Sequence, residues 1–126
     1  MNISSYADLL TAAGAQPQPQ RMLFAFARAE RPDAQSGALT PVMCVDKTLD
    51  QLGTFDALVD ESRHMGAHWD IVFVSSMSGR AGAPPPSSQA QPLLDRMVSY
   101  IHTGEVGSLL AFDRQGQLLD FAVSSA

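Results

Sequence analysis

The chain has 126 residues and a net charge of −5, and 45% of its residues are hydrophobic while 17% are charged. This length and apolar content suit a single domain over residues 1–126, and they exclude an intrinsically disordered chain. The 8 basic residues are scattered rather than clustered, so we expect no nucleic-acid partner.

No segment is typical of a membrane or secreted protein. The longest apolar runs, residues 23–29 and 71–74, are far shorter than the about 20 residues of a membrane-spanning helix. The sequence does not open with a basic and then an apolar stretch, as a signal peptide does. The single cysteine, Cys44, cannot form an internal disulfide. We therefore expect a cytoplasmic bacterial protein with no membrane partner.

The N-terminal segment predicts a helix. Apolar residues recur at spacings of three and four over residues 3–13, where Ser4 or Ser5 caps the first amides and Gly14 ends the helix. Residues 15–20 then form a linker of prolines and glutamines, because each proline biases the residue before it away from helix.

Two strands and a second helix are expected next. Residues 21–30 are apolar on both faces, which indicates a central strand, and residues 39–46 form a second strand after a loop. Residues 48–51 have the pattern of a capping box. Gly53 separates the short turn that follows from a longer helix, which Thr54 caps.

The second half of the chain adds a strand, a loop and a helix. Residues 69–77 are β-branched and aromatic, and they form the strongest predicted strand. Residues 78–88 are rich in glycine and proline and must form an irregular loop. A helix follows, for which Ser88 and Gln91 offer a second capping box, and Gly104 ends it.

The C-terminal segment predicts a β-hairpin. Apolar runs over residues 108–113 and 117–123 flank a short turn in which Gly116 suits a positive φ. The full order of elements is α-β-β-α-β-α-β-β. Because helices alternate with the middle strands and the last pair is antiparallel, we predict an α/β fold of mixed α+β character. It has three helices and a mixed sheet of about five strands.

The loop over residues 78–88 is the candidate ligand site. It follows the predicted central strand, and open α/β sheets bind ligands at the carboxyl ends of their strands. Ser78 offers a hydroxyl, Gly79 and Gly82 let backbone amides face a ligand, and Arg80 can pair with an anion. The loop lacks the glycine-rich phosphate motifs, and its prolines lack amides. A plain surface connection is therefore the alternative interpretation.

No residue is predicted to be catalytic or to bind a metal. Cys44 has no sequence signature that would stabilise a thiolate, and we interpret it as buried and inert. His64 and His68 have the spacing of some zinc sites, but Gly66 lies between them and no third ligand is evident. We therefore expect no catalytic residue, no metal site and no cofactor.

The last predicted strand favours self-association. Apolar strands at a sheet edge can pair with another chain or bury a face in a dimer. Leu118, Leu119 and Phe121 are the expected contact residues of a homo-oligomer or a protein partner. In the alternative, these side chains fill the core of the monomer.

Three segments carry a resemblance to a known family: residues 38–52 (ALTPVMCVDKTLDQL), 68–80 (HWDIVFVSSMSGR) and 108–117 (SLLAFDRQGQ). Over its whole length the chain resembles a family of short proteobacterial proteins labelled "ribonucleotide reductase subunit alpha". Reductase large subunits use a radical-bearing cysteine, a separate redox pair and a barrel scaffold. One cysteine excludes that catalysis by this chain alone, so no residue is assigned a reductase role.

Two functions are open at this point. The first is a non-catalytic binding or protein-interaction module. The second is a protein that binds a small ligand, either an anion or a nucleotide, or a minor enzyme, and that uses the loop after the central strand.

Overall fold

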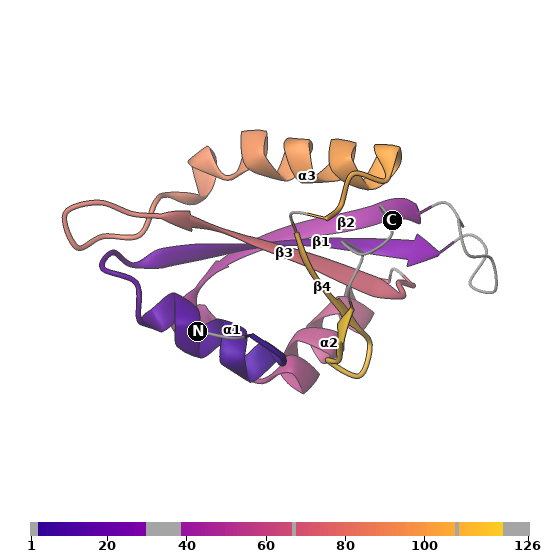
Figure 1. Ribbon diagram of the computed structural model, residues 1–126, viewed down its shortest axis with the longest axis horizontal. Helices are drawn as coiled ribbons and strands as arrows, with labels where there is room; N and C mark the ends of the chain where they lie inside the picture. Colours follow the sequence, from indigo (N-terminus) through magenta and orange to yellow (C-terminus); the bar gives the residue numbers. More distant parts are fainter. Residues whose placement is uncertain (1–2, 30–38, 67, 108, 120–126) are drawn as a thin grey trace.

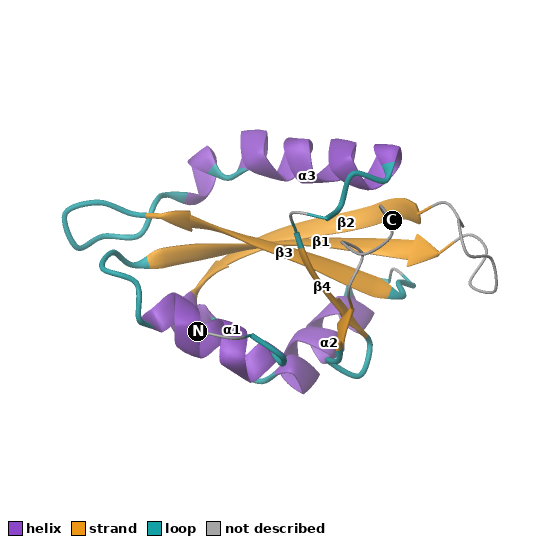
Figure 2. Cartoon of the chain, viewed as in Figure 1, coloured by secondary structure: helices purple, strands orange, loops and turns teal. Residues whose placement is uncertain are grey.

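A computed structural model describes residues 3–29, 39–66, 68–107 and 109–119. In this part of the chain, a sheet carries helices on both faces (Figures 1 and 2). The helices are α1 (Tyr6–Gly14), α2 (Phe55–His64) and α3 (Gln91–Thr103), with short 3-10 turns η1 (Leu49–Gln51) and η2 (Ser87–Gln89). The strands are β1 (Gln20–Ala29), β2 (Leu39–Thr48), β3 (Ile71–Ser78), β4 (Leu110–Asp113) and β5 (Leu118–Leu119).

The five strands lie in the order β2-β1-β3-β4-β5, and every neighbouring pair is antiparallel. The predicted element order and the C-terminal hairpin agree with this arrangement, but the predicted mixed sheet is wrong. A helix between two strands is typical of a parallel crossover, which is why α3 misleads. In the structure β4 starts opposite Val74, in the middle of β3, and runs back to lie opposite Ile71.

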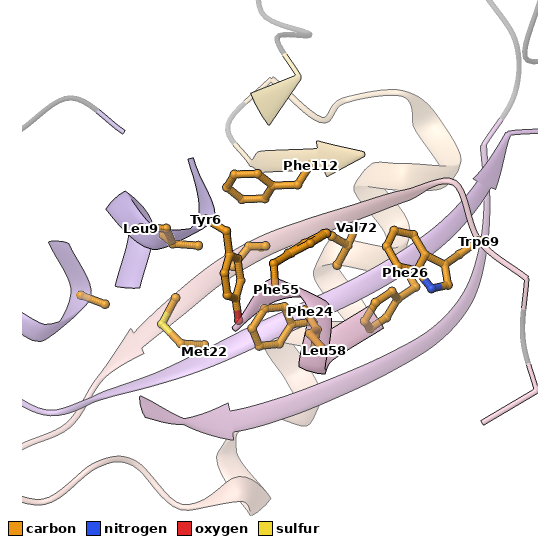
Figure 3. Packing of buried hydrophobic residues seen from close by; sticks show 12 residues of the cluster. Tyr6, Leu9, Met22, Phe24, Phe26, Phe55, Leu58, Trp69, Val72 and Phe112 are labelled. Carbon is orange, nitrogen blue, oxygen red and sulfur yellow. The ribbon is translucent and has the colours of Figure 1, made fainter. Parts of the chain in front are cut away.

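The two phenylalanines of β1 point to the same face of the sheet. Along β1, Met22, Phe24 and Phe26 face α1 and α2, where they join an aromatic cluster (Figure 3). The side chains of Ala25 and Ala27 point to the other face, which α3 covers (Figure 2). All of these residues are buried. The prediction of a strand covered on both faces is therefore confirmed for β1.

Helix ends show where local sequence decides the structure. The Ser5 hydroxyl accepts from the Asp8 amide at 3.1 Å at the start of α1, and Thr54 caps α2 in the same way. The predicted capping box of Ser88 is wrong. Ser88 lies in η2, which immediately precedes α3. The N-cap residue of α3 is therefore Ala90, whose side chain cannot accept a hydrogen bond from the first amides of the helix.

In the described part of the chain, no helix is long and apolar enough to cross a membrane.

Candidate functional site

The loop after β3 protrudes beyond the end of the sheet (Figure 1). Its first part is a tight turn, in which the Arg80 amide donates to the Ala83 carbonyl oxygen at 3.0 Å and the Ala83 amide donates back at 3.1 Å. Ala81 and Gly82, between them, have φ values of +56° and +79°, as a type I′ turn requires. We call residues 79–86 the site loop.

The segment before β1 holds the first half of the site loop. The Gly79 amide donates to the Pro19 carbonyl oxygen at 2.8 Å, and the Gly82 amide donates to the Gln18 side-chain oxygen at 3.0 Å. The predicted linker over residues 15–20 therefore does more than connect α1 to β1, because it fixes the position of a loop that lies far along the chain.

An ion pair holds the second half of the site loop. Arg21 donates from Nε to the Pro85 carbonyl oxygen at 2.7 Å and from Nη1 to Asp46 Oδ2 at 2.7 Å. The Ser87 hydroxyl donates to the same Asp46 oxygen at 2.6 Å. The two charged side chains are only 13% and 18% exposed, so water screens this pair less than it screens a surface pair.

Gly79 is required for packing. A Cβ atom at this position would lie 1.8 Å from the Ala83 carbonyl oxygen, which is inside any tolerated contact. The turn can therefore close against Gly79 only because that residue has no side chain. Sequence reasoning identified this glycine, but it assigned the residue to ligand contact alone.

The site loop lines a cavity of about 390 Å³ that is open to solvent, which we call the site hollow. Its lining comes from the end of β3, the site loop and η2: Ser78, Gly79, Arg80, Ala83, Pro84, Pro85, Pro86 and Gln89. Three of the four predicted ligand residues thus meet at one cavity, and Gly82 is not among its lining residues. The Arg80 side chain is exposed, and it makes no ion pair or hydrogen bond with the residues that the structure describes.

The predicted backbone cradle for an anion is not available. The amides of Gly79, Arg80, Gly82 and Ala83 all donate to oxygens of the protein itself, and the three prolines that follow have no amide hydrogen. The antiparallel sheet also removes the expectation of a shared carboxyl edge, since neighbouring strands end on opposite sides. A ligand in the site hollow has to be held by side chains.

Several residues that shape the site were missed in the sequence. Gln18, Pro19, Arg21 and Asp46 position the site loop, and Gln89 lines the site hollow. Their contacts join segments far apart in the chain, so a motif search has no local pattern to find. A weak signal was present, because Arg21 and Asp46 are charged residues next to the apolar runs of two predicted strands.

The other sequence candidates do not form a reactive centre. Burial, and secondarily the Asp95 carboxylate, raise the pKa of the Cys44 thiol, which disfavours the nucleophilic thiolate. His64 Nδ1 lies 2.8 Å from the backbone carbonyl oxygen of Asp60, whereas His68 Nε2 lies 3.4 Å from the Asp70 carboxylate, so the two histidines have separate partners. Within the described ranges, no three histidine, cysteine or acidic side chains are grouped as a metal site requires.

The predicted interface residues lie at the end of the described chain. Leu118 and Leu119 are both half-buried, and they pack against the core on opposite faces of the sheet. Phe121 lies outside the described residues. The role of this hairpin in a homo-oligomer stays a prediction.

The Tyr6 hydroxyl is a buried polar group outside the site. Tyr6 is 4% exposed, and its oxygen has no hydrogen-bond partner in the described part of the chain. Burial raises the pKa of Tyr6 from 10.0 to about 12. The unfolded chain therefore ionises first, and the stability of the fold decreases as the pH rises from 10 to 12.

No family model, curated protein or solved structure matches the chain. Evidence for its function therefore comes from its own residues, above all from the site hollow.

Proposed function

We propose that this chain is a non-catalytic binding module that takes a carboxylate-bearing ligand in the site hollow. One observation carries the proposal. The Arg80 guanidinium has no partner among the described residues, and it stands at a cavity of about 390 Å³.

The chemistry of the lining favours a carboxylate. A guanidinium presents planar N–H donors that match the two oxygens of a carboxylate. The Ser78 hydroxyl and the Gln89 amide offer further donors from the same cavity. The lining of the site hollow has one cationic side chain, Arg80, and the amides of Gly79, Arg80 and Ala83 that lie there are already bonded within the protein. The site hollow is therefore less suited to the multiple charges of a nucleotide phosphate.

The walls of the site hollow add shape. Pro84, Pro85 and Pro86 provide rigid apolar surface, and Arg21 holds the middle proline through its carbonyl oxygen. A ligand with an apolar group beside its carboxylate fits this combination. Because the loop is already held in place, binding does not have to order it, which lowers the entropic cost.

The carboxylate has two sources with the same chemistry. It belongs either to a free organic acid or to an acidic residue of a partner protein. Native mass spectrometry of the gently purified chain distinguishes them, since the first adds the mass of a small molecule and the second adds a whole chain.

Nuclear magnetic resonance (NMR) titration with sodium benzoate tests the proposal. Benzoate should shift the signals of Ser78, Gly79 and Gln89, whereas benzamide, its neutral counterpart, should not. The Arg80→Ala variant should lose at least about tenfold in benzoate affinity, which corresponds to about 1.4 kcal/mol. Arg96→Ala is the matched control, because it removes the same charge from an exposed arginine of α3. Equal affinity in the two variants would remove the basis of the proposal.

A second candidate function is self-association through the C-terminal hairpin. It is favoured by the position of β5 at the edge of the sheet, where it pairs only with β4 among the described strands. Introducing a charge with Phe121→Asp should lower the oligomer mass by native mass spectrometry. An unchanged mass would count against a role for this hairpin. The cytoplasmic location and the family resemblance also stay proposals.

A further inference from the structure

We infer that the second half of β3 is a docking edge for an extended acidic peptide, which adds to the sheet as a further strand. This site does not depend on the proposed function of the site hollow. Among the described residues, β4 pairs with β3 only from Ile71 to Val74, since it begins at Leu110 opposite Val74. Residues 75–78, which we call the open edge, pair with β1 on one side and with no described strand on the other. Figure 1 shows this half of β3 to the left of β4, between α3 above and α1 below.

The exposure of β3 changes at the point where β4 begins. Residues 72–74 are buried, whereas Ser76 and Ser78 are exposed and Ser75 and Met77 are half-buried. The pairing with β1 continues in the same register along the whole of β3. The open edge is therefore a formed strand with one side free.

Four backbone groups of the open edge point away from β1. In an antiparallel pair, residues that bond to the partner strand alternate with residues that face outward. The amide of Gly79, one residue after β3, donates to the carbonyl oxygen of Pro19, one residue before β1. By alternation from this pair, the amides and carbonyl oxygens of Ser76 and Ser78 face the free side. An added strand needs this pattern of donors and acceptors.

The edge strand β2 is protected against such pairing, and the open edge is not. Proteins block a free strand edge with prolines, bulges or charged side chains. β2 contains Pro41 beside a shift in its register, and the Thr48 amide at its end donates to the Gln51 side-chain oxygen at 3.0 Å. Residues 75–78, Ser-Ser-Met-Ser, contain no proline or charged residue, and their pairing with β1 has no register shift. This contrast indicates that the open edge is available to a partner.

The surroundings of the open edge define the charge of the peptide. On the α3 side, a hollow of about 190 Å³ has Ser75 and Arg96 in its lining. The exposed Arg96 guanidinium makes no ion pair or hydrogen bond with the described residues. On the α1 side, a hollow of about 330 Å³ has a mixed polar and apolar lining that includes Ser76 and Ser78. No acidic residue lines either hollow, so a carboxylate beside Arg96 meets a cation without a repelling neighbour.

Strand geometry then gives the pattern of the peptide. Paired residues on neighbouring strands point to the same face of a sheet. Residues opposite Ser76 and Ser78 therefore point towards α1, and the residues between them point towards α3 and Arg96. Glutamate suits the α3 side. Threonine suits the mixed lining on the α1 side and is common in strands.

NMR titration with the peptide acetyl-Thr-Glu-Thr-Glu-Thr-Glu-Thr-amide tests the inference on the wild-type chain. It should shift the amide signals of Ser76 and Ser78 and slow their exchange with solvent at least about tenfold at saturation. The control is the same peptide with methylated amide nitrogens on its inner threonines, which keeps the charge but loses the donors that face β3. It should bind at least about tenfold more weakly. Equal affinity of the two peptides would overturn strand addition, and the absence of shifts at Ser76 and Ser78 would overturn the site.

Charge is tested separately from backbone pairing. A peptide with lysine in place of glutamate should bind at least about threefold more weakly, and Arg96→Gln should weaken the glutamate peptide by a similar factor. Arg63→Gln is the matched control, because it replaces an exposed arginine on α2 that does not line either hollow. Equal affinity for the two peptides would contradict the acidic character of the partner.

A second copy of the chain is the other occupant that this edge could pair with. In that case the purified chain would be a dimer by native mass spectrometry. The amides of Ser76 and Ser78 would also exchange slowly before any peptide is added. That combination would overturn the peptide as the occupant, whereas a monomer with fast exchange at both amides is the result that we expect.

Discussion

The site loop and the turn between β4 and β5 are both short reversals with a glycine at positive φ, yet they are held in different ways. In the second turn, Asp113 Oδ1 accepts from the amides of Gln115 and Gln117 at 2.8 and 3.0 Å. In the site loop, Gly82 and Pro85 bond to residues that are 64 positions away in the chain. One turn is therefore a product of its own sequence, and the other depends on the tertiary structure around it.

This difference matters for function because the site loop lines a cavity. A loop that distant residues hold in place can present a side chain such as Arg80 in a fixed position. A turn held by its own aspartate reverses the chain and needs nothing else. Substitutions at Gly79, Arg21, Asp113 and Ala81 test how each turn is held. We expect the largest loss of stability at Gly79, where the contact is closest.

Gly79→Ala should have the largest effect. The new Cβ atom would collide with the Ala83 carbonyl oxygen, so we expect a loss of about 3 kcal/mol in the free energy of unfolding. Gly116→Ala, in the other turn, has a positive φ and brings a Cβ atom to 3.1 Å from the Phe55 ring, a much milder contact, so it should cost about 1 kcal/mol. Urea unfolding measures both values. A Gly79→Ala variant as stable as Gly116→Ala would contradict the close packing of the site loop.

Arg21→Met should come next. It keeps the apolar stem of the side chain but removes the bonds to Pro85 and Asp46, for an expected loss of about 2 kcal/mol. Benzoate affinity should decrease together with stability, because the proline wall is released. The control is Arg63→Met, which breaks an exposed ion pair with Asp60 and should change stability by less than about 0.5 kcal/mol. Equal losses in the two variants would show that Arg21 does not hold the loop.

Asp113→Ala should have a smaller and local effect. It removes the acceptor of two amides in the second turn, and we expect a loss of about 1 kcal/mol. Asp113→Asn retains an oxygen acceptor and should recover most of that loss. Benzoate affinity should stay at the wild-type value in both variants. A weaker benzoate affinity would show that the two turns are coupled.

Ala81→Gly should have the smallest effect and the opposite sign. Ala81 has φ +56° in the site loop, a conformation that costs an L-residue about 1 kcal/mol or more. Glycine relieves this strain but loses more backbone entropy on folding, so the net gain should be about 0.5 kcal/mol. Thermal unfolding detects the change, and a clear loss of stability would contradict the left-handed turn.

Elements governed by neighbouring residues could be predicted from the sequence. The alternation of Phe24, Ala25 and Phe26 predicted a strand buried on both faces, and the structure confirms it. Thr54 caps α2 as expected, and Gly116 has the expected positive φ. In each case the pattern that supports the prediction lies in residues close together in the chain.

Features that depend on distant residues could not be predicted. The direction of β4 is set by its pairing with β3, and the spacing of helices and strands does not encode it. The site hollow could be located at Ser78 and Arg80, because glycine and proline mark an irregular loop. The way in which the loop is held could not be predicted, because Gln18 and Arg21, which bond to it, belong to other parts of the chain. The loop amides expected to bind an anion already donate to oxygens of the protein, so side chains rather than backbone amides are now expected to hold the ligand.

Amide hydrogen exchange of the wild-type chain, measured by NMR, tests most directly whether the site loop is held in place. The amides of Gly79, Arg80 and Ala83 donate to backbone oxygens, so they should exchange slowly. The amide of Ala81 has no such partner among the described residues and should exchange fast, which provides an internal control. Fast exchange at all four positions would contradict the ordered site loop and, with it, the preformed hollow that the proposed function requires.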